Sequence, residues 1–504
     1  MRSLASVLAG LTILFTAALA PDTAEARWLR AESPRFIVYS DGDEGPLRDY
    51  VQNLETFDRL LRGLHGLPLD APPPRKLEVY LIRERDLDLV RPGSRGSIAG
   101  FYSPSSEDIF AVAVRERRQD YILLHEYVHH FMHQHFPYGY PGWLVEGYAE
   151  YFMGADIGTE WITYGDPAES RGGWLFESDQ LPLRAVVTRE GAARWDAEDR
   201  QSFYAQSWVL THYFMATPER RERLYAYMRE LGDGADPVEA LERAADMPLA
   251  ALARTLQTYI RGGMPYSRVA ASLFPDVEIA VTPLPASADD LLLVNQRLRL
   301  GAEPSERADV VDLVRRRAAP HGEDPLALLA LGHAELHFGD RSEGERLLQR
   351  LLVVSPGHPE ALQLLASSRY AQAQETSGAD STRLLSEARD LLVRALEQAP
   401  DDYRTYYWIG LVREGATGYP TDNDIAIWSA AYDLAPQLSG IRLGAGRALI
   451  QAARSEEAIA LLGPVANNPH GGDVADYAAR LIALAQAGQP PEPEPDWEAL
   501  ASED

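Results

Sequence analysis

Apolar and polar positions follow two different periods in the first 160 residues of the chain. Short runs that are apolar throughout or at alternate positions are typical of β-strands, and apolar residues three and four apart are typical of amphipathic helices. The strand-like runs are residues 36–40, 77–82 and 109–114, and the helix-like runs are 47–64, 121–134 and 142–154. This pattern predicts a small mixed sheet followed by two helices, which a break rich in Pro and Gly separates.

Residues 100–102 and 109–114 flank a Ser- and Pro-rich turn, which predicts a β-hairpin in this first region.

The pattern becomes mainly helical after residue 200. Amphipathic helices are predicted between residues 202 and 261, and residues 265–285 are irregular, with one short strand at 277–281.

The C-terminal part of the chain repeats itself. Pro325 and Pro359 each open an apolar helical run and lie 34 residues apart, which is the period of tetratricopeptide repeats. Pro fits the first turn of a helix because its missing N–H would have no partner there. Pro400 and Pro436 close later helices at a similar interval, so we expect three to four helix pairs and a capping helix at 474–487. An irregular helical bundle is the alternative.

The N-terminus has the features of a secretory signal. A single Arg precedes an apolar, Ala-rich run that is too short for a confident membrane span, and Ala24-Glu25-Ala26 is a suitable cleavage site. We therefore predict export to the periplasm or the exterior, with cleavage after Ala26; an uncleaved anchor is the alternative. No later apolar run approaches the roughly 20 residues that cross a bilayer.

These observations predict five segments: a signal peptide at 1–26, an α+β domain at 27–265, a linker or degenerate helical pair at 266–320, repeats at 321–488, and a disordered acidic, Pro-rich tail at 489–504.

Composition excludes several classes of function. The net charge of −27 argues against nucleic acid and against an anionic membrane surface as partner. The chain has no Cys, so disulfides, thiolate metal sites and Cys nucleophiles are excluded, and a metal would need His and carboxylate ligands.

The motif that carries chemistry is His125-Glu126-Tyr127-Val128-His129. On a helix, residues four apart lie on one face about 5–6 Å apart between Cβ atoms, which lets two imidazoles meet one Zn²⁺. Glu126 lies beside the metal without being a ligand and can act as general base on a water. His130, His133 and His135 follow closely and are interpreted as non-ligands.

A catalytic zinc needs a third protein ligand and an open position. Glu146 follows in the second predicted helix, which the break would fold back onto the first. Glu150 is one turn further on the same face, where its carboxylate could accept the other N–H of a ligand histidine and fix its tautomer.

Residues 125–151 resemble the gluzincin metallopeptidases, the thermolysin and aminopeptidase group. The stretch WLVEGYAEY at 143–151 is similar to their second motif element, although the gap from the second His to the Glu is slightly shorter than in the aminopeptidases. The resemblance implies a zincin-like α+β fold, with His125, His129 and Glu146 as zinc ligands and Glu126 as base. It also implies that the Glu150 carboxylate accepts the other N–H of a ligand histidine.

The same resemblance implies an oxyanion donor from a downstream helix. Tyr204 is the candidate and His212 the competitor, and either could instead be a packed core residue. In gluzincins an edge strand also pairs with the substrate; strand 109–114 is the candidate here, with an ordinary sheet strand as the alternative.

The chain as a whole is therefore expected to be a secreted zinc-dependent peptidase. A zinc-activated water would attack the peptide bond, and the repeats would recruit a protein partner or substrate. An alternative is a non-catalytic zinc-containing tetratricopeptide scaffold, and a third is zinc hydrolysis of a bond other than a peptide. The absence of a motif that captures a free amino terminus favours an endopeptidase.

Overall fold

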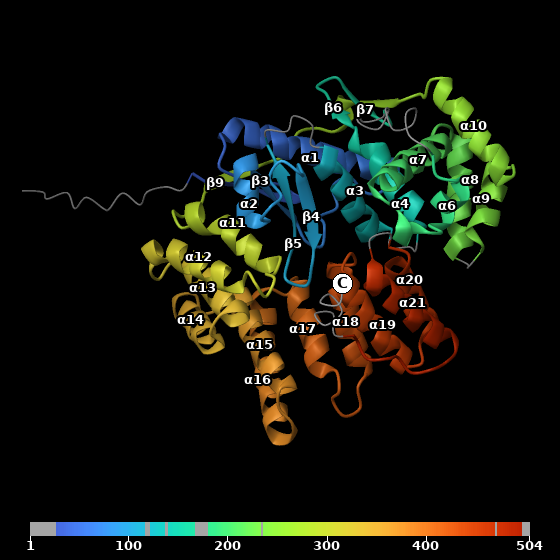
Figure 1. The fold of residues 1–504 in the computed structure, drawn as a ribbon. Coiled ribbons are helices and arrows are strands. Elements are labelled where there is room, and N and C mark those ends of the chain that lie inside the picture. The colour runs from blue at the N-terminus through green and yellow to red at the C-terminus, as the bar shows by residue number, and fades with distance from the viewer. Residues whose placement is uncertain are drawn as a thin grey trace, which may run out of the picture.

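The computed structural model describes residues 27–115, 121–136, 140–166, 180–232, 235–468 and 471–495. Figure 1 shows a half built of a sheet and helices, from the N-terminus to about β9, lying above a curved array of helices that forms the rest of the chain. The predicted signal peptide lies outside the described residues, so export stays a prediction. Among the described helices none is both long and apolar enough to span a membrane.

The main sheet has six strands in the order β4-β5-β3-β2-β1-β9. Their bounds are β1 Leu29–Glu32, β2 Phe36–Ser40, β3 Leu77–Ile82, β4 Gly100–Pro104, β5 Ile109–Val114 and β9 Ala280–Pro283. β2, β3 and β5 are parallel neighbours, while β4, β1 and β9 pair antiparallel. The mixed sheet predicted from the hydrophobic pattern is thus present, and β5 lies inside it rather than at an edge.

Alternation along the central strands explains how both faces of the sheet are covered. Val79 and Ala111 point into the core that α1 (Glu44–Leu64) and α3 (Tyr121–His135) share, while Tyr80 and Phe110 point to the opposite face. That opposite face packs against α2 (Leu87–Val90) and α11 (Ala288–Arg299). Burial on both faces fits the nearly continuous apolar sequence of β3 and β5.

Helices complete the half that contains the sheet. α4 packs against α3 and α7, and α6 to α10 continue the bundle (Figure 1). A small sheet of order β6-β7-β8 lies beside them. The bounds are α4 Gly142–Met153, α6 Leu183–Thr188, α7 Ala197–Met215, α8 Pro218–Gly232, α9 Pro237–Ala245, α10 Leu249–Arg261, β6 Asp156–Ile157, β7 Trp161–Tyr164 and β8 Ser267–Ala270.

The C-terminal array consists of antiparallel helix pairs. Asp324, Asp340 and Asp402 cap three of the helices by accepting hydrogen bonds from backbone N–H groups of the first turn. The bounds are α12 Arg307–Ala318, α13 Pro325–Phe338, α14 Arg341–Val354, α15 Pro359–Gln374, α16 Gly378–Gln398, α17 Tyr403–Arg413, α18 Asp422–Leu434, α19 Ser439–Gln451, α20 Ser455–Ala466 and α21 Gly472–Gln486. We call α13 to α21 the repeat array.

Two expected segments differ in the structure. The first part of the expected linker at 266–320 supplies β8 and β9, which pair with β7 and β1; only its second part, α11 and α12, is a helical pair. The first part of the expected disordered tail lies against the array: Tyr477 donates a hydrogen bond to the carbonyl of Glu492 at 2.9 Å, and Arg480 pairs with the Glu492 carboxylate at 2.8 Å. Both contacts join segments that local sequence patterns do not connect.

A buried cluster of charges joins the repeat array to the turn between β4 and β5. Asp108, which is fully buried, is paired with Arg75 at 2.7 Å and with Arg299. Arg299 also reaches Glu360 of α15 at 2.8 Å. Burial raises the pKa of Asp108, but Arg299 and Arg75 outweigh that effect and hold the pKa well below its ordinary value.

The same turn contacts α17 directly. The Tyr403 hydroxyl donates to the carbonyl of Ser105 at 2.9 Å, and Arg404 donates to the carbonyl of Glu107 at 3.4 Å. Leu438 and Ile441 of the array belong to the same apolar core as α1, α3 and α4. The array is therefore packed onto the rest of the chain and is not a separate module on a linker.

Removing Arg299, the cation at the centre of this interface, should lower the stability of the protein. Arg299→Met leaves the buried carboxylate of Asp108 with one partner fewer, so we expect the protein to lose about 3–5 kcal/mol of stability against urea. Arg341→Met is the control, because its ion pair with Glu375 is 43% and 56% exposed and should contribute less than about 1 kcal/mol. Equal losses in the two variants would contradict the interpretation.

Candidate metal centre

α3 places the first two predicted ligands one turn apart on the same face. His125 Nε2 and His129 Nε2 are 3.1 Å apart. Both imidazoles are half-buried, so they face a site that solvent can reach.

α4 brings the third predicted ligand to the same point. Glu146 Oε2 lies 3.4 Å from His125 Nε2 and 3.6 Å from His129 Nε2. Two ligand atoms on a tetrahedral zinc, each about 2.0–2.1 Å from the metal, lie about 3.3 Å apart. The three separations are close to that edge length, so the donor set fits Zn²⁺ in both chemistry and size. Within the described part of the chain, these three residues are the one group of three or more His, Asp and Glu side chains that could hold an ion.

Glu150 lies behind the first ligand. Its Oε1 is 3.5 Å from His125 Nδ1, on the side of the ring away from Glu146, and its side chain is 1% exposed. A carboxylate in this place favours the tautomer with the proton on Nδ1, which presents the Nε2 lone pair to the site. Burial lowers the pKa of His125, but the charges of Glu146, Glu150 and Glu126 more than offset this and leave that pKa above its ordinary value.

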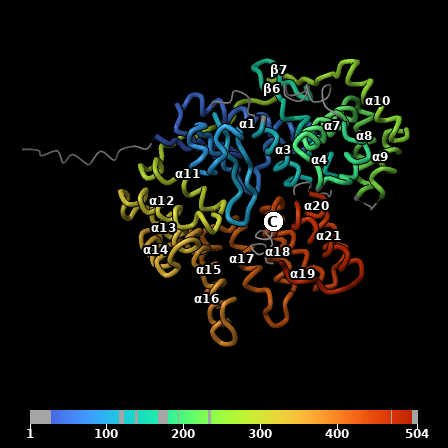
Figure 2. Tube along the Cα trace, in the orientation of Figure 1, coloured from blue at the N-terminus to red at the C-terminus, as the bar shows by residue number. Residues whose placement is uncertain are grey.

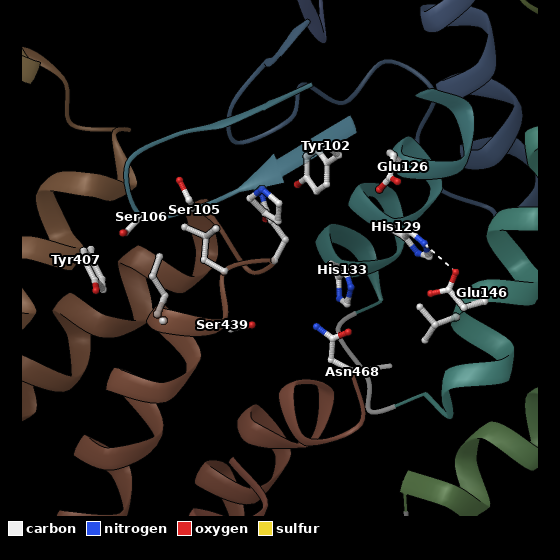
Figure 3. A pocket seen from close by; sticks show the side chains of 16 residues that line it. Tyr102, Ser105, Ser106, Glu126, His129, His133, Glu146, Tyr407, Ser439 and Asn468 are labelled. Atoms are coloured by element: carbon white, nitrogen blue, oxygen red, sulfur yellow. Dashed lines mark ion pairs between the residues drawn. The ribbon is translucent and has the colours of Figure 1, made fainter. Parts of the chain in front are cut away.

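Glu126 lies in the same cleft as the ligands without belonging to their group. It lines the cleft together with His129 and Glu146, and it is half-buried (Figure 3). This is the place that the motif predicts for a base.

The other histidines of α3 have different surroundings. His130 Nδ1 is 2.9 Å from the Tyr102 hydroxyl, and His135 Nε2 is 3.2 Å from Arg62. Burial lowers the pKa of His130 to about 3 and that of His135 to about 4. His133 lines the cleft one turn beyond His129, and burial, with the charge of His129 next, lowers its pKa to about 3. The structure thus brings none of the three into the ligand group.

The two candidates for an oxyanion donor lie in different environments on α7. His212 is 1% exposed, and its Nδ1 is hydrogen-bonded to the Tyr259 hydroxyl at 2.8 Å. Its ring meets that of Tyr151 edge-on and that of Trp208 at a tilt. It is a core residue, and burial lowers its pKa to about 4. Tyr204 is half-buried and is not among the residues that line the cleft.

Arg189 is near enough to Glu146 for the two charges to interact. Burial lowers the pKa of Arg189, while the negative charge of Glu146 acts in the opposite direction. Arg189 ends α6 with a left-handed backbone, φ 58°, which is uncommon outside Gly. Neither its place nor its conformation is readable from the sequence.

The cleft itself has a volume of about 400 Å³ and lies between the two halves of the chain. Tyr102, Pro104, Ser105 and Ser106 form the wall at the β4 end, α3 and α4 form the wall with the candidate ligands, and the turn before α19 with Asn468 forms the wall on the array side (Figure 3). The tube in Figure 2 shows the same arrangement, with α19 to α21 below α3 and α4. The contributions of Tyr102 and of the repeats cannot be predicted from the sequence, because nothing local connects them to the His125–His129 motif.

One glycine allows the close approach that the site requires. A Cβ atom on Gly147 would lie 2.3 Å from the backbone oxygen of Ser207 and 2.3 Å from Thr211 Oγ1, both on α7. α4 therefore presses directly on α7 one residue after the candidate ligand Glu146. A side chain here would push α4, and Glu146 with it, away from its place.

Comparisons with known proteins are sparse. No family model matches the chain, and no curated protein matches it. Among solved structures, the thermophilic TPR protein TTC0263 of Thermus thermophilus is similar at 21% identity and TM-score 0.34, covering 40% of this chain and 100% of that one. A double mutant of MamA from RS-1 is 19% identical with TM-score 0.26, covering 40% of this chain and 95% of that one. MamA from AMB-1 is 20% identical with TM-score 0.24, covering 35% and 96%. The structures similar to this chain are thus TPR proteins, and at these scores the likeness assigns no function.

The packing at Gly147 predicts a selective loss of metal. Gly147→Ala should displace Glu146 and weaken zinc binding at least about 10-fold, with destabilisation of about 1–3 kcal/mol from overpacking. Competition with a fluorescent zinc chelator measures the first effect. Gly63→Ala in α1 is the control, since its nearest contact would be 3.8 Å away; zinc affinity unchanged in Gly147→Ala would refute the role of this contact.

Proposed function

We propose that the chain is a zinc-dependent peptidase. The observation that supports the proposal most strongly is the convergence of two imidazole nitrogens and one carboxylate oxygen, with separations of 3.1, 3.4 and 3.6 Å, at a cleft that Glu126 also lines. Three protein ligands with room for a fourth are the arrangement of catalytic zinc rather than structural zinc.

Each side chain of the site has a part in the proposed reaction. His125, His129 and Glu146 would hold the ion, which when bound supplies Lewis-acid polarisation of a carbonyl and lowers the pKa of a water to about 7. Glu126 takes the proton of the attacking water and delivers it to the leaving amine. Glu150 keeps the proton of His125 on Nδ1.

The strand that could pair with an extended substrate is a different one from the strand expected from the sequence. Strand 109–114 is β5, whose two neighbours β4 and β3 already use its hydrogen-bonding edges, so it cannot pair with a substrate. β4 is the terminal strand of the sheet, and its residues Tyr102 and Pro104 line the cleft. If an extended peptide adds to this sheet, it adds to β4.

Replacing the proposed base should separate zinc binding from peptide hydrolysis. Glu126→Gln removes the proton acceptor without removing a ligand, so we expect one zinc per chain and hydrolysis of a peptide library reduced about 10²–10⁴-fold. Glu222→Gln on the exposed face of α8 is the control and should match the wild type. Full activity in Glu126→Gln would remove Glu126 from the mechanism.

Replacing Tyr204 and replacing His212 should affect kcat differently. Tyr204→Phe should retain zinc and lose about 10²-fold in kcat if its hydroxyl donates to the oxyanion. His212→Phe should retain kcat per bound zinc, because the imidazole is enclosed by aromatic residues away from the cleft lining. Unchanged kinetics in Tyr204→Phe would transfer the donor role to another group, and Tyr102 is the hydroxyl to test next because it lines the cleft.

A non-catalytic scaffold is the second candidate. The helix pairs α13 to α20 build an array of the kind that presents extended surfaces to proteins. Against this, part of the array is occupied by the chain's own β4–β5 turn, through Tyr403 and Arg404. Stoichiometric zinc without cleavage of any peptide in the library would favour the scaffold.

A further inference from the structure

The repeat array supplies one complete wall of the metal cleft. Residues 437–441, which form the turn between α18 and α19 and the first turn of α19, line the cleft together with Tyr407 and Asn468. We call residues 437–441 the α18–α19 turn. Figure 3 shows Ser439 and Asn468 across the cleft from His129, His133 and Glu146. A substrate at the metal therefore contacts the repeats.

Contacts to both halves hold this turn in place. Gln437 lines the same cleft as Tyr102 of β4. Leu438 and Ile441 are 3% and 1% exposed and lie in the apolar core shared with α3 and α4. Arg442, 2% exposed, donates to the carbonyls of Pro436 at 2.6 Å and Leu461 at 3.1 Å. The turn is thus a fixed wall and not a loose flap.

The chemical character of the wall differs from that of the chain. The whole protein has a net charge of −27, yet the described residues of the array that line the cleft offer only amide, hydroxyl and apolar groups. Apart from the histidines, the charged residues that line it are Glu126 and Glu146, both on the metal side. A charged substrate side chain placed against the α18–α19 turn would lose hydration without gaining an ion pair.

Size restricts the substrate further. About 400 Å³ lies near the lower end of the ~300–1,000 Å³ typical of ligand pockets. A folded domain cannot enter such a space, whereas a few residues of extended chain can.

We propose that the α18–α19 turn is the specificity wall of the site, which accepts a short extended peptide segment with an uncharged side chain facing the repeats. This inference rests on the proposed peptidase function. It makes the repeats part of the substrate site itself, in addition to any surface on which they recruit a protein.

Blocking the wall tests the inference directly. A Cβ atom on Gly440 would have the Tyr407 ring as its nearest neighbour at 3.8 Å, so a larger side chain has room to enter the cleft. In the full-length protein loaded with Co²⁺, the visible spectrum reports the binding of an N-acyl tripeptide hydroxamate without turnover. We expect Gly440→Trp to retain one metal ion and to raise the Kd at least 10-fold. Gly463→Trp in α20 is the control. A Cβ atom on Gly463 would have no neighbour within 4 Å, and Gly463 does not line the cleft, so this variant should bind the hydroxamate like the wild type.

A charge in the wall tests the selectivity. Tripeptide hydroxamates that differ only in a central Leu, Asp or Lys should bind the wild type with the Leu compound at least 10-fold tighter than either charged one. Ser439→Arg should reverse the order of Leu and Asp while leaving metal content unchanged. Equal Kd values for the three compounds in the wild type, or a Kd that neither Gly440→Trp nor Ser439→Arg alters, would overturn the proposal.

Failure of the peptidase function is distinguishable from failure of the wall. A protein that binds Co²⁺ and the hydroxamates as expected but cleaves no peptide overturns the peptidase function and supports the wall. A protein that cleaves peptides but whose Kd neither Gly440→Trp nor Ser439→Arg alters overturns the wall alone. Failure to bind Co²⁺ overturns both.

Discussion

The buried carboxylate of Glu146 constrains how α3, α4 and α7 pack around the candidate metal centre. Its side chain is 1% exposed and is held within 3.6 Å of two imidazole nitrogens. A carboxylate withdrawn from water in this way is costly unless a positive charge or a metal compensates it. The close packing of α4 on α7 at Gly147, the fold-back of α4 on α3 and the carboxylate of Glu150 all serve to bring this one oxygen to the two histidines.

The two halves of the molecule meet around the same site. The β4–β5 turn carries Asp108 into contact with two arginines, Arg75 just before β3 and Arg299 of α11, and the backbone of that turn accepts hydrogen bonds from α17. The turn before α19 in the array then lines the same cleft as the candidate ligands His129 and Glu146. A contact that stabilises the fold thus also fixes the shape of the space in which a substrate would lie.

The sequence was most informative where the signal is local. The spacing of His125 and His129 on one helix, the break before α4 and the alternation in β2 and β3 could all be predicted, because each depends on neighbours within a few residues. The helix pairs of the array could be predicted from the period of their prolines. Glu146 needed the resemblance of its surrounding motif to that of gluzincins as well as its position after the break.

Long-range pairing could not be predicted in the same way. β9 joins β1 across some 250 residues of chain and β8 joins β7, so residues expected to be a linker complete two sheets. The burial of β5 between two strands, and the meeting of the α18–α19 turn with the metal cleft, likewise depend on tertiary packing that no local pattern encodes. The sequence made Tyr204 the candidate oxyanion donor and His212 its competitor, but it could not show that His212 is enclosed in the core.

X-ray absorption at the zinc K-edge of the purified full-length protein tests the central claim most directly. We expect one zinc per chain, bound by two imidazole nitrogens and by oxygen ligands at about 2.0–2.1 Å. In His129→Ala the absorption spectrum should show one imidazole ligand instead of two. A protein that copurifies with no zinc and binds none when it is added, or a zinc whose ligand shell His129→Ala leaves unchanged, would contradict it.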